Sequence, residues 1–182
     1  MTALILLAQG CEELEAITCI DLLRRGNIKV TVAGLSNQTI IASRGVKIEP
    51  DITIGEIKNK IYDMVILPGG LPGADNLNAS NEVHELLNNH HKNNKWLAAI
   101  CAAPKVFAKA GFLNNRNYTC YPDSVNEIDL VSSRYLVDAV VVDDNIVTSR
   151  GPGTAIDFAL KLIELLSSEE VKDVVEQQLL RS

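Results

Sequence analysis

Residues 2–35 read TALILLAQGCEELEAITCIDLLRRGNIKVTVAGL and contain a complete strand–helix–strand unit. The run Leu4–Ala8 is continuously apolar, as expected of a parallel strand that is covered on both faces. Glu12–Arg25 has apolar residues at helical spacing and basic residues in its last turn, and Gly26 follows as a stop. Lys29–Leu35 returns to a strand pattern. Because two strands joined by a helix lie parallel in one sheet, this segment predicts an α/β fold.

The same alternation continues along the chain. Further buried strands are predicted at Met64–Leu67 and Trp96–Ile100, and hairpins around Arg44-Gly45 and around residues 143–145. Further helices are predicted at Glu82–His91, from Pro104 to Ala110, at Thr154–Leu166 and, after a capping box of Ser167 with Glu170, through Leu179. This pattern predicts a single domain over residues 1–182, an α/β sandwich with a mostly parallel central sheet. Ligands in such folds bind at the carboxyl ends of the strands.

Composition narrows the class of protein. Hydrophobic residues make up 47% of the 182 residues, but the apolar runs are far shorter than the ~20 residues that span a membrane. A net charge of −6 with scattered lysines and arginines disfavours nucleic acid as a partner. The N-terminus has no basic region before its apolar run, so we expect no signal peptide, a cytoplasmic location and reduced cysteines.

The stretch AAICAAP, residues 98–104, follows a predicted strand and precedes a predicted helix. Cys101 lies among alanines, and a nucleophile at a sharp strand-to-helix turn needs such small neighbours. The N-terminus of the helix is expected to lower the pKa of this thiol. A buried cysteine that only fills the core fits the local sequence equally well.

Three other segments place polar groups at strand ends. In LPGG, Gly69 and Gly70 allow backbone amides to approach a ligand as an oxyanion hole, although an ordinary turn has the same pattern. In SRGPGT, Arg150 and the free amides around it are expected beside an anion. Glu12, Glu13 and Glu15 follow the first strand, where acidic residues also serve simply as partners of the helix dipole.

Cofactor and metal sites are not expected. The three histidines, His84, His90 and His91, lie on one polar helix, where the adjacent pair does not share a face. The first strand–helix turn has only Gly10, so it lacks a dinucleotide fingerprint.

The other cysteines are expected to be structural. If one helix contained both Cys11 and Cys19, they would lie ~12 Å apart along its axis, too far for a disulfide. Cys120 lies in a strand pattern and is expected in the core.

Several motifs in order resemble the ThiJ/PfpI (DJ-1-like) superfamily, and within it most closely the bacterial YajL branch. They cover nearly the whole chain: GCEELEA (10–16), RRGNIKVTVAGL (24–35), SRGV (43–46), DMVILPGG (63–70), AAICAAP (98–104) and TSRGPGTAIDFAL (148–160). The resemblance implies a flavodoxin-like three-layer α/β/α sandwich and a homodimer that works without a cofactor.

By motif, the resemblance implies roles for individual residues. Cys101 matches the reactive cysteine, and Glu15 the glutamate that hydrogen-bonds its thiol; a protonated Glu15 would donate to the thiolate. Gly70, with Gly69 beside it, and Ala102 match the anion pocket. Two arginines match the residues lining this pocket: Arg150 and, from the partner subunit, Arg44.

One position departs from the pattern, because Tyr121 stands where many relatives have a histidine near the cysteine. A Cys-His protease mechanism is therefore not expected. The resemblance implies glyoxalase or protein deglycase chemistry on methylglyoxal or glyoxal adducts, with a small aldehyde or a glycated protein as substrate. The alternative is a redox sensor or oxidative-stress chaperone with unfolded or thiol-containing clients, acting through oxidation of Cys101.

Overall fold

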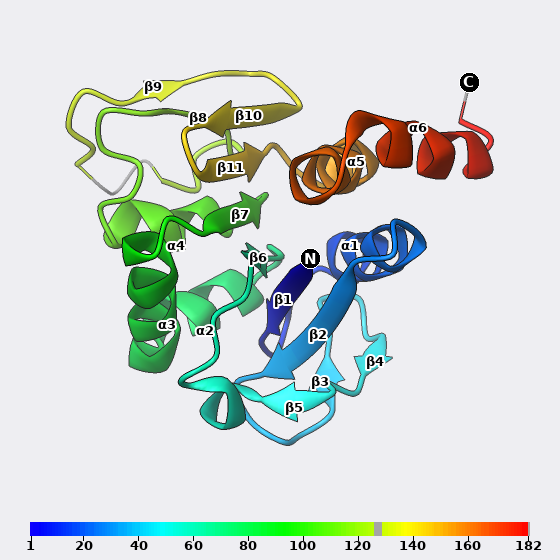
Figure 1. Cartoon of the computed structure of the whole chain (residues 1–182). Coiled ribbons are helices and arrows are strands. Elements are labelled where there is room, and N and C mark those ends of the chain that lie inside the picture. The colour runs from blue at the N-terminus through cyan, green and yellow to red at the C-terminus, as the bar shows by residue number, and fades with distance from the viewer. Residues whose placement is uncertain (126–128, 182) are drawn as a thin grey trace.

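A seven-stranded sheet forms the centre of the protein in a computed structural model, which describes residues 1–125 and 129–181. Its strand order is β10-β11-β7-β6-β1-β2-β5, and every pairing is parallel except that of β10 with β11 (Figure 1). The strands are β1 (Thr2–Leu7), β2 (Lys29–Gly34), β5 (Ile52–Thr53), β6 (Met64–Leu67), β7 (Trp96–Ile100), β10 (Val140–Asp143) and β11 (Ile146–Ser149). The expected strand–helix–strand unit is confirmed, since β1 and β2 pair in parallel from Thr2↔Lys29 to Leu7↔Gly34.

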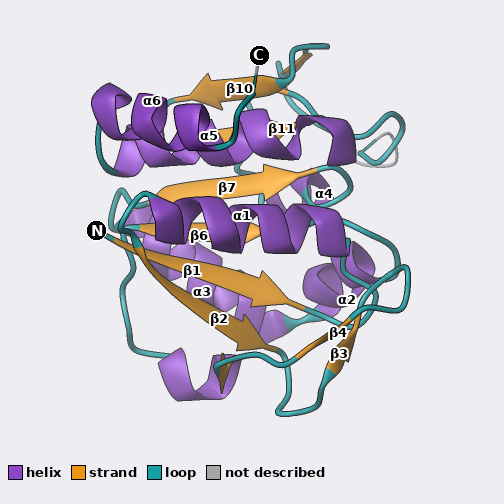
Figure 2. Ribbon diagram, turned by 90° about the vertical axis from the view of Figure 1, so that its right-hand side faces the viewer, coloured by secondary structure: helices purple, strands orange, loops and turns teal. Residues whose placement is uncertain are grey.

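Helices cover both faces of this sheet (Figure 2). One face carries α1 (Glu13–Arg25) and α5 (Ala155–Leu166), with α6 (Glu169–Gln178) packed on α5. The other face carries α2 (Gly73–Ala79), α3 (Asn81–Lys92) and α4 (Pro104–Lys109). The result is the flavodoxin-like α/β/α sandwich. Among the described residues, no helix is both long and apolar enough to cross a membrane.

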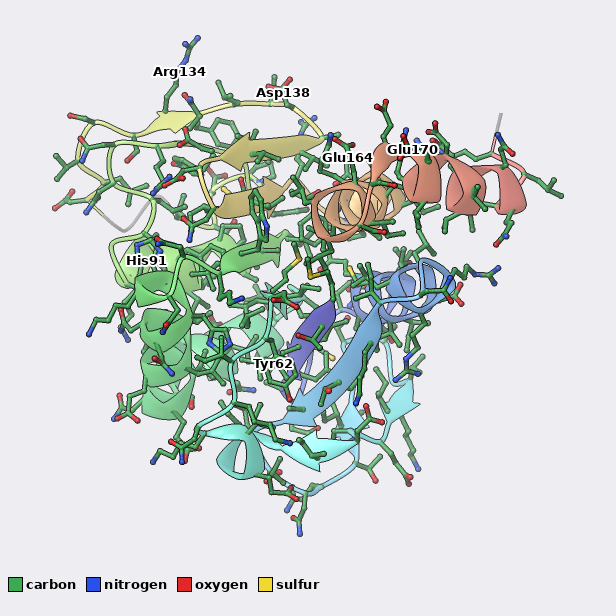
Figure 3. All side chains as sticks on the ribbon, in the orientation of Figure 1. Tyr62, His91, Arg134, Asp138, Glu164 and Glu170 are labelled. Carbon is green, nitrogen blue, oxygen red and sulfur yellow. The ribbon has the colours of Figure 1, made fainter. Side chains whose placement is uncertain are left out.

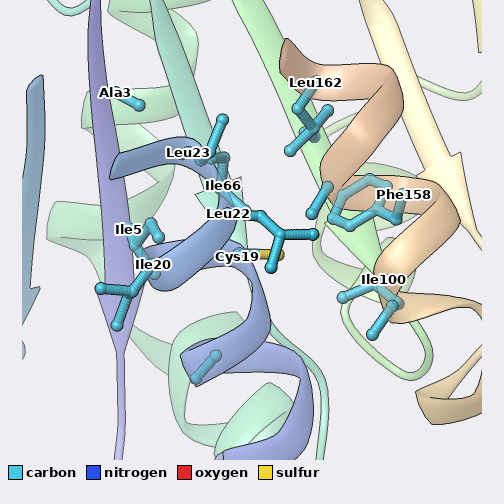
Figure 4. Close-up of a cluster of buried hydrophobic side chains, with 14 of the residues drawn as sticks. Ala3, Ile5, Cys19, Ile20, Leu22, Leu23, Ile66, Ile100, Phe158 and Leu162 are labelled. Carbon is cyan, nitrogen blue, oxygen red and sulfur yellow. The ribbon is translucent and has the colours of Figure 1, made fainter. Parts of the chain in front are cut away.

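The side chains of β1 explain why both faces need a cover. Alternate residues of a strand point to opposite faces. Ala3, Ile5 and Leu7 belong to the core beneath α1 and α5. Figure 4 shows Ile5 beside Ile20 of α1, and it shows Phe158 and Leu162, which α5 contributes to the same core. Leu4 and Leu6 belong to the core on the α2–α4 side. The continuous apolar run is therefore divided between two cores.

Short elements complete the fold. Two small sheets pair β3 (Ile40–Ile41) with β4 (Lys47–Ile48) and β8 (Asn117–Tyr118) with β9 (Arg134–Tyr135), and two 3-10 turns occur, η1 (Ile54–Ile57) and η2 (Pro152–Thr154). Both expected hairpins are present as β3–β4 and β10–β11. Sequence patterns did not predict β5, η1, α2 or β9, all of which are short.

The structure corrects two local predictions. Ser168, not Ser167, is the N-cap of α6: its hydroxyl accepts a hydrogen bond from the amide of Val171 at 3.4 Å, while Ser167 ends α5. The first helix begins at Glu13, one residue after its predicted start, so it does not include Cys11, and the condition for Cys11 and Cys19 to share a helix is not met. Cys120 is buried as expected, but it lies after β8 and not within a strand.

Candidate active site

Cys101 lies directly after β7, at the carboxyl end of a central strand. Its φ is +63°, a left-handed conformation that is uncommon for residues other than glycine. The backbone holds this turn in place, because the amide of Cys101 donates to Ser149 O at 3.0 Å and its carbonyl accepts from the amide of Tyr121 at 2.8 Å. Such a strained turn between a strand and a helix is the geometry of a nucleophile elbow. The side chain is only 8% exposed.

Glu15 lies in the first turn of α1 and reaches across to this elbow. It is fully buried, and its Oε2 accepts a hydrogen bond from the amide of Gly69 at 2.7 Å. Its Oε1 has no well-formed hydrogen bond with any described residue. The other polar neighbour of the carboxyl group is the thiol of Cys101. The structure therefore brings together two residues that are far apart in the sequence.

The two side chains influence each other's protonation. Burial raises the pKa of Glu15 to about 7, although the hydrogen bonds from Gly69 and from the Cys101 thiol lower it. Burial, and then the charge and hydrogen bond of Glu15, raise the pKa of Cys101 to about 12. Backbone amides do lower the pKa of the thiol, but burial and Glu15 outweigh them, so the net shift is opposite to the expected one. With its raised pKa the Cys101 thiol keeps its proton near neutral pH, and the carboxyl group of Glu15 lies beside it.

Backbone amides surround the sulfur atom of Cys101. The amides of Gly70 and Ala102 form hydrogen bonds to it that lower the pKa of the thiol. Gly69 contributes differently from the expectation, because its amide binds Glu15. Gly70 has φ +85°, and a Cβ there would lie 2.4 Å from the amide nitrogen of Glu12. Only glycine allows this approach, which aligns LPGG with the start of α1.

Within one subunit, both arginines of the predicted anion pocket form hydrogen bonds away from the Cys101–Glu15 pair, and the role of Arg44 in the partner subunit's pocket stays a prediction. Arg44, on the β3–β4 turn, is exposed and donates to the carbonyl of Ser43 at 3.3 Å. Arg150 is also exposed and donates to the carbonyl of Val137 at 3.5 Å.

The amides of SRGPGT are not free, contrary to expectation. The amide of Arg150 donates to Ala139 O at 3.2 Å, and the amides of Gly151 and Thr154 are bonded within the loop. The loop therefore contributes the Ser149 carbonyl, which binds the amide of Cys101, whereas most of its own amides are not available to bind an anion.

All three histidines lie on α3, which covers the face of the sheet opposite α1 (Figure 2), and Figure 3 labels His91 on this helix. His90 is buried, and its ring accepts from the amide of Tyr62 at 3.0 Å and donates to Leu86 O at 2.8 Å. His91 stacks on Phe112, and His84 contacts the carbonyl of Asn78. Since each ring is engaged there, none serves as a base for Cys101.

Tyr121 is joined to the elbow through its backbone, because its amide donates to the Cys101 carbonyl. Its ring lies beside Gly151, where an added Cβ would be 3.5 Å from Tyr121 Cδ2. The residue is half exposed, at 53%. Tyr121 and Ala102 also line a groove of about 920 Å³ that sequence analysis did not anticipate. The groove follows Ala102, Lys105 and Lys109, whose helical spacing was the available signal.

The four cysteines are all free and buried, and the described residues hold no cluster of His, Cys, Asp or Glu suited to a metal ion. Burial, and then the charge of nearby glutamates, raise the pKa of Cys11 to about 12. Burial also raises the pKa of Cys120. Of these four thiols, Cys101 alone combines a strained turn, a hydrogen-bonding carboxyl neighbour and two converging backbone amides.

Comparison with known proteins points to one family. The DJ-1/PfpI family model matches residues 1–165. The chain is 43% identical to protein dj-1beta of Drosophila melanogaster over 182 residues, covering 98% of this chain and 96% of that protein. It is 39% identical to the glutathione-independent glyoxalase DJR-1.2 of Caenorhabditis elegans, covering 93% and 90%.

Solved structures agree with these sequence matches. The crystal structure of Drosophila melanogaster DJ-1beta superposes with a TM-score of 0.94 at 42% identity, covering 100% of this chain and 98% of that one. The structure described as Toxoplasma gondii DJ-1, oxidized, gives 0.94 at 37% identity, with the same coverage. The relation to the YajL branch stays a prediction. The fold, the elbow cysteine and these matches lead to one conclusion: the chain belongs to the DJ-1/PfpI family.

Proposed function

We propose that this protein is a cofactor-independent enzyme that converts reactive carbonyl compounds, with Cys101 as nucleophile and Glu15 as general base. The observation that carries the proposal is the pairing of a buried carboxyl group, whose pKa is about 7, with the thiol of a strained elbow. A base is most effective when its pKa lies near the working pH. The thiol itself, with its raised pKa, needs such a base.

For methylglyoxal the proposed steps are redox-neutral overall. Glu15 accepts the thiol proton as the sulfur of Cys101 bonds to the aldehyde carbon, and passes it to the aldehyde oxygen, which faces the amides of Gly70 and Ala102 and becomes the hydroxyl of the hemithioacetal. The freed carboxylate next takes the proton of the former aldehyde carbon and delivers it to the adjacent carbon, while the hydroxyl proton moves to the oxygen of that adjacent carbon. The adjacent carbon becomes an alcohol and the first carbon becomes a thioester. Water then cleaves the thioester, releasing lactate and the free thiol. The sum is methylglyoxal plus water giving lactate.

The relatives support this class of chemistry, since one is named a glutathione-independent glyoxalase. The same first step applies to a glyoxal adduct on a protein, which would make the enzyme a deglycase. The test is to follow lactate formation from methylglyoxal by wild type and by Cys101→Ala, Glu15→Gln and Cys120→Ala. We expect the first two variants to lose at least a hundredfold in kcat/KM and Cys120→Ala to match wild type. Equal turnover by Cys101→Ala and wild type would refute the proposal.

A second candidate function rests on the amides around the sulfur. The donors at Gly70 and Ala102 would also stabilise an oxidised, anionic Cys101. Each peroxide molecule would add one oxygen to the sulfur and leave as water, giving first the sulfenic and then the sulfinic acid. A redox sensor or oxidative-stress chaperone would act in this way, and one similar structure is described as oxidized.

Peptide mass spectrometry after limited peroxide treatment tests this second function. We expect oxygen addition at Cys101 before any addition at Cys11, Cys19 or Cys120, together with protection of an aggregating client protein. Oxidation of the other cysteines first, or no change in client aggregation, would contradict it.

We also propose that two copies associate, most simply in the cytoplasm. Leu14, Ile17, Ile41 and Val46 are apolar and 45–53% exposed. They lie on α1 and on the β3–β4 hairpin. Glu13 of α1 holds the hairpin against the helix, because its carboxylate accepts hydrogen bonds from the amides of Arg44 at 2.9 Å and Val46 at 3.5 Å. A second copy covering this surface would bring Arg44 toward the partner's site.

A further inference from the structure

The groove beside Cys101 is much larger than a small dicarbonyl requires. Its volume is about 920 Å³, near the upper end of the range for sites that hold drug-sized ligands. It begins at Ala102, whose amide faces the Cys101 sulfur, and at Tyr121, whose amide is bonded to the Cys101 carbonyl. The groove therefore begins at the residue that follows Cys101 in the chain and extends from there along α4.

The direction of the groove follows α4. Three lining residues form one stripe along that helix: Lys105, Ala108 and Lys109. Ala102, just before α4, and Gly111 and Asn114, just beyond its C-terminal end, also line the groove. Since the 6 residues of α4 alone measure about 9 Å, a molecule the size of methylglyoxal bonded to Cys101 cannot reach that end. An extended polypeptide advances ~3.3 Å per residue, so a few residues would fill the same length.

The lining of the groove suits a polypeptide backbone. Lys105 Nζ donates to Asp75 Oδ1 at 2.7 Å, and Lys109 Nζ donates to the carbonyl of Asn78 at 3.2 Å. Both ammonium groups are thus held toward α2, and each keeps further N–H donors for peptide carbonyls. The small side chains of Ala102 and Ala108 leave room between them. Leu71 and Tyr121, which are 58% and 53% exposed, provide apolar surface on the same groove.

We propose that this groove is the subsite for the polypeptide part of a carbonyl-modified substrate, with the modified side chain directed at Cys101. The proposal rests on the proposed function for the identity of the reacting group, but its own claim concerns binding along α4. Lys105 and Lys109 are binding residues in this proposal, and the ring of Tyr121 separates the groove from the Gly151 loop.

Fluorescence anisotropy with a labelled probe tests the proposal without chemistry. The probe is an acetylated pentapeptide with a central Nε-(carboxyethyl)lysine, a stable relative of a methylglyoxal–lysine adduct, and the protein is Cys101→Ala. We expect the pentapeptide to bind at least tenfold more tightly than the same modified lysine as a free amino acid. Adding Lys105→Ala and Lys109→Ala should weaken peptide binding at least fivefold. Lys92→Ala, an exposed lysine on α3 outside the groove, is the matched control and should have no effect.

Two results would overturn the proposal: equal affinity for the pentapeptide and the free modified lysine, or equal peptide affinity with and without the two lysine substitutions. Circular dichroism establishes that the substituted proteins are folded. Turnover of methylglyoxal by wild type is measured separately. Loss of that turnover would refute the proposed function, whereas failure of peptide binding with turnover intact would refute only the subsite.

Discussion

Glu15 illustrates how a single residue can serve chemistry at the expense of stability. Its pKa rises from 4.5 to about 7 on folding, because burial disfavours the charged carboxylate. For such a group the folded state binds protons more tightly than the unfolded state. Its relative stabilisation is fully present below pH 4.5 and is lost as the pH rises through about 7.

We therefore predict that Glu15→Gln stabilises the protein at pH 8 by up to roughly 3 kcal/mol while it abolishes turnover. The amide side chain retains an acceptor for the Gly69 amide and carries no charge. Urea unfolding of wild type and variant at pH 5 and pH 8 measures the effect, and Glu12→Gln serves as control. A gain in stability as large at pH 5 as at pH 8 would contradict this account of the buried charge.

The backbone of Cys101 gives a second prediction at this scale. A left-handed conformation costs roughly 1 kcal/mol or more in any residue with a Cβ, and glycine avoids this cost. We expect Cys101→Gly to be more stable than Cys101→Ala by about 1 kcal/mol, with both lacking the thiol. The comparison variant Ala99→Gly, in the interior of β7, should instead be less stable than wild type. Urea midpoints measure all of these differences.

At the scale of elements, the position of a helix start can be tested directly. Ser168 accepts from the amide of Val171 and so satisfies a free donor of α6, whereas no described hydrogen bond involves the Ser167 hydroxyl. We predict that Ser168→Ala destabilises α6 by about 1 kcal/mol and that Ser167→Ala has little effect. Hydrogen exchange of the α6 amides distinguishes the two variants. The opposite order would restore the capping box expected from the sequence.

This one-residue difference shows what the sequence could and could not predict about elements. Long segments with strong apolar periodicity, such as β1, α1, β7 and α5, were placed within a residue or two of their observed ends. Either of two adjacent serines suited the start of α6, because local chemistry does not distinguish them. The strand β5 and the helix α2 are short and depend on the elements packed around them, so their own residues carry little signal.

Some features of the candidate site could also be predicted from the sequence, whereas others could not. Cys101 was identifiable because the elbow needs small residues next to the thiol in sequence. The raised pKa values of Cys101 and Glu15 were not predictable, because they depend on burial that arises only when the start of α1 packs against LPGG in the folded protein. The groove along α4 was missed for a related reason. One of its walls is α2, and another is the turn after Cys120, which lies far from α4 in the sequence.

For the whole molecule, the exposed apolar surface of α1 and the β3–β4 hairpin is the feature with the largest consequence. Ile17 lies one turn after Glu13, whose carboxylate holds the hairpin, so Ile17 and Val46 share this surface. If a second copy covers it, a charge at Ile17 must be buried without a partner on association, which is strongly unfavourable.

We predict that Ile17→Asp converts a dimer into a monomer, whereas Val174→Asp does not, because Val174 is 53% exposed on α6, outside the surface formed by α1 and the β3–β4 hairpin. Light scattering after size-exclusion chromatography measures the mass of each variant. If Arg44 of the partner subunit completes the anion pocket, Ile17→Asp and Arg44→Ala should lower methylglyoxal kcat/KM by similar factors, and their combination should lower it no further. Additive losses would place Arg44 outside the partner's pocket, and an Ile17→Asp protein that remains dimeric would place the interface on another surface.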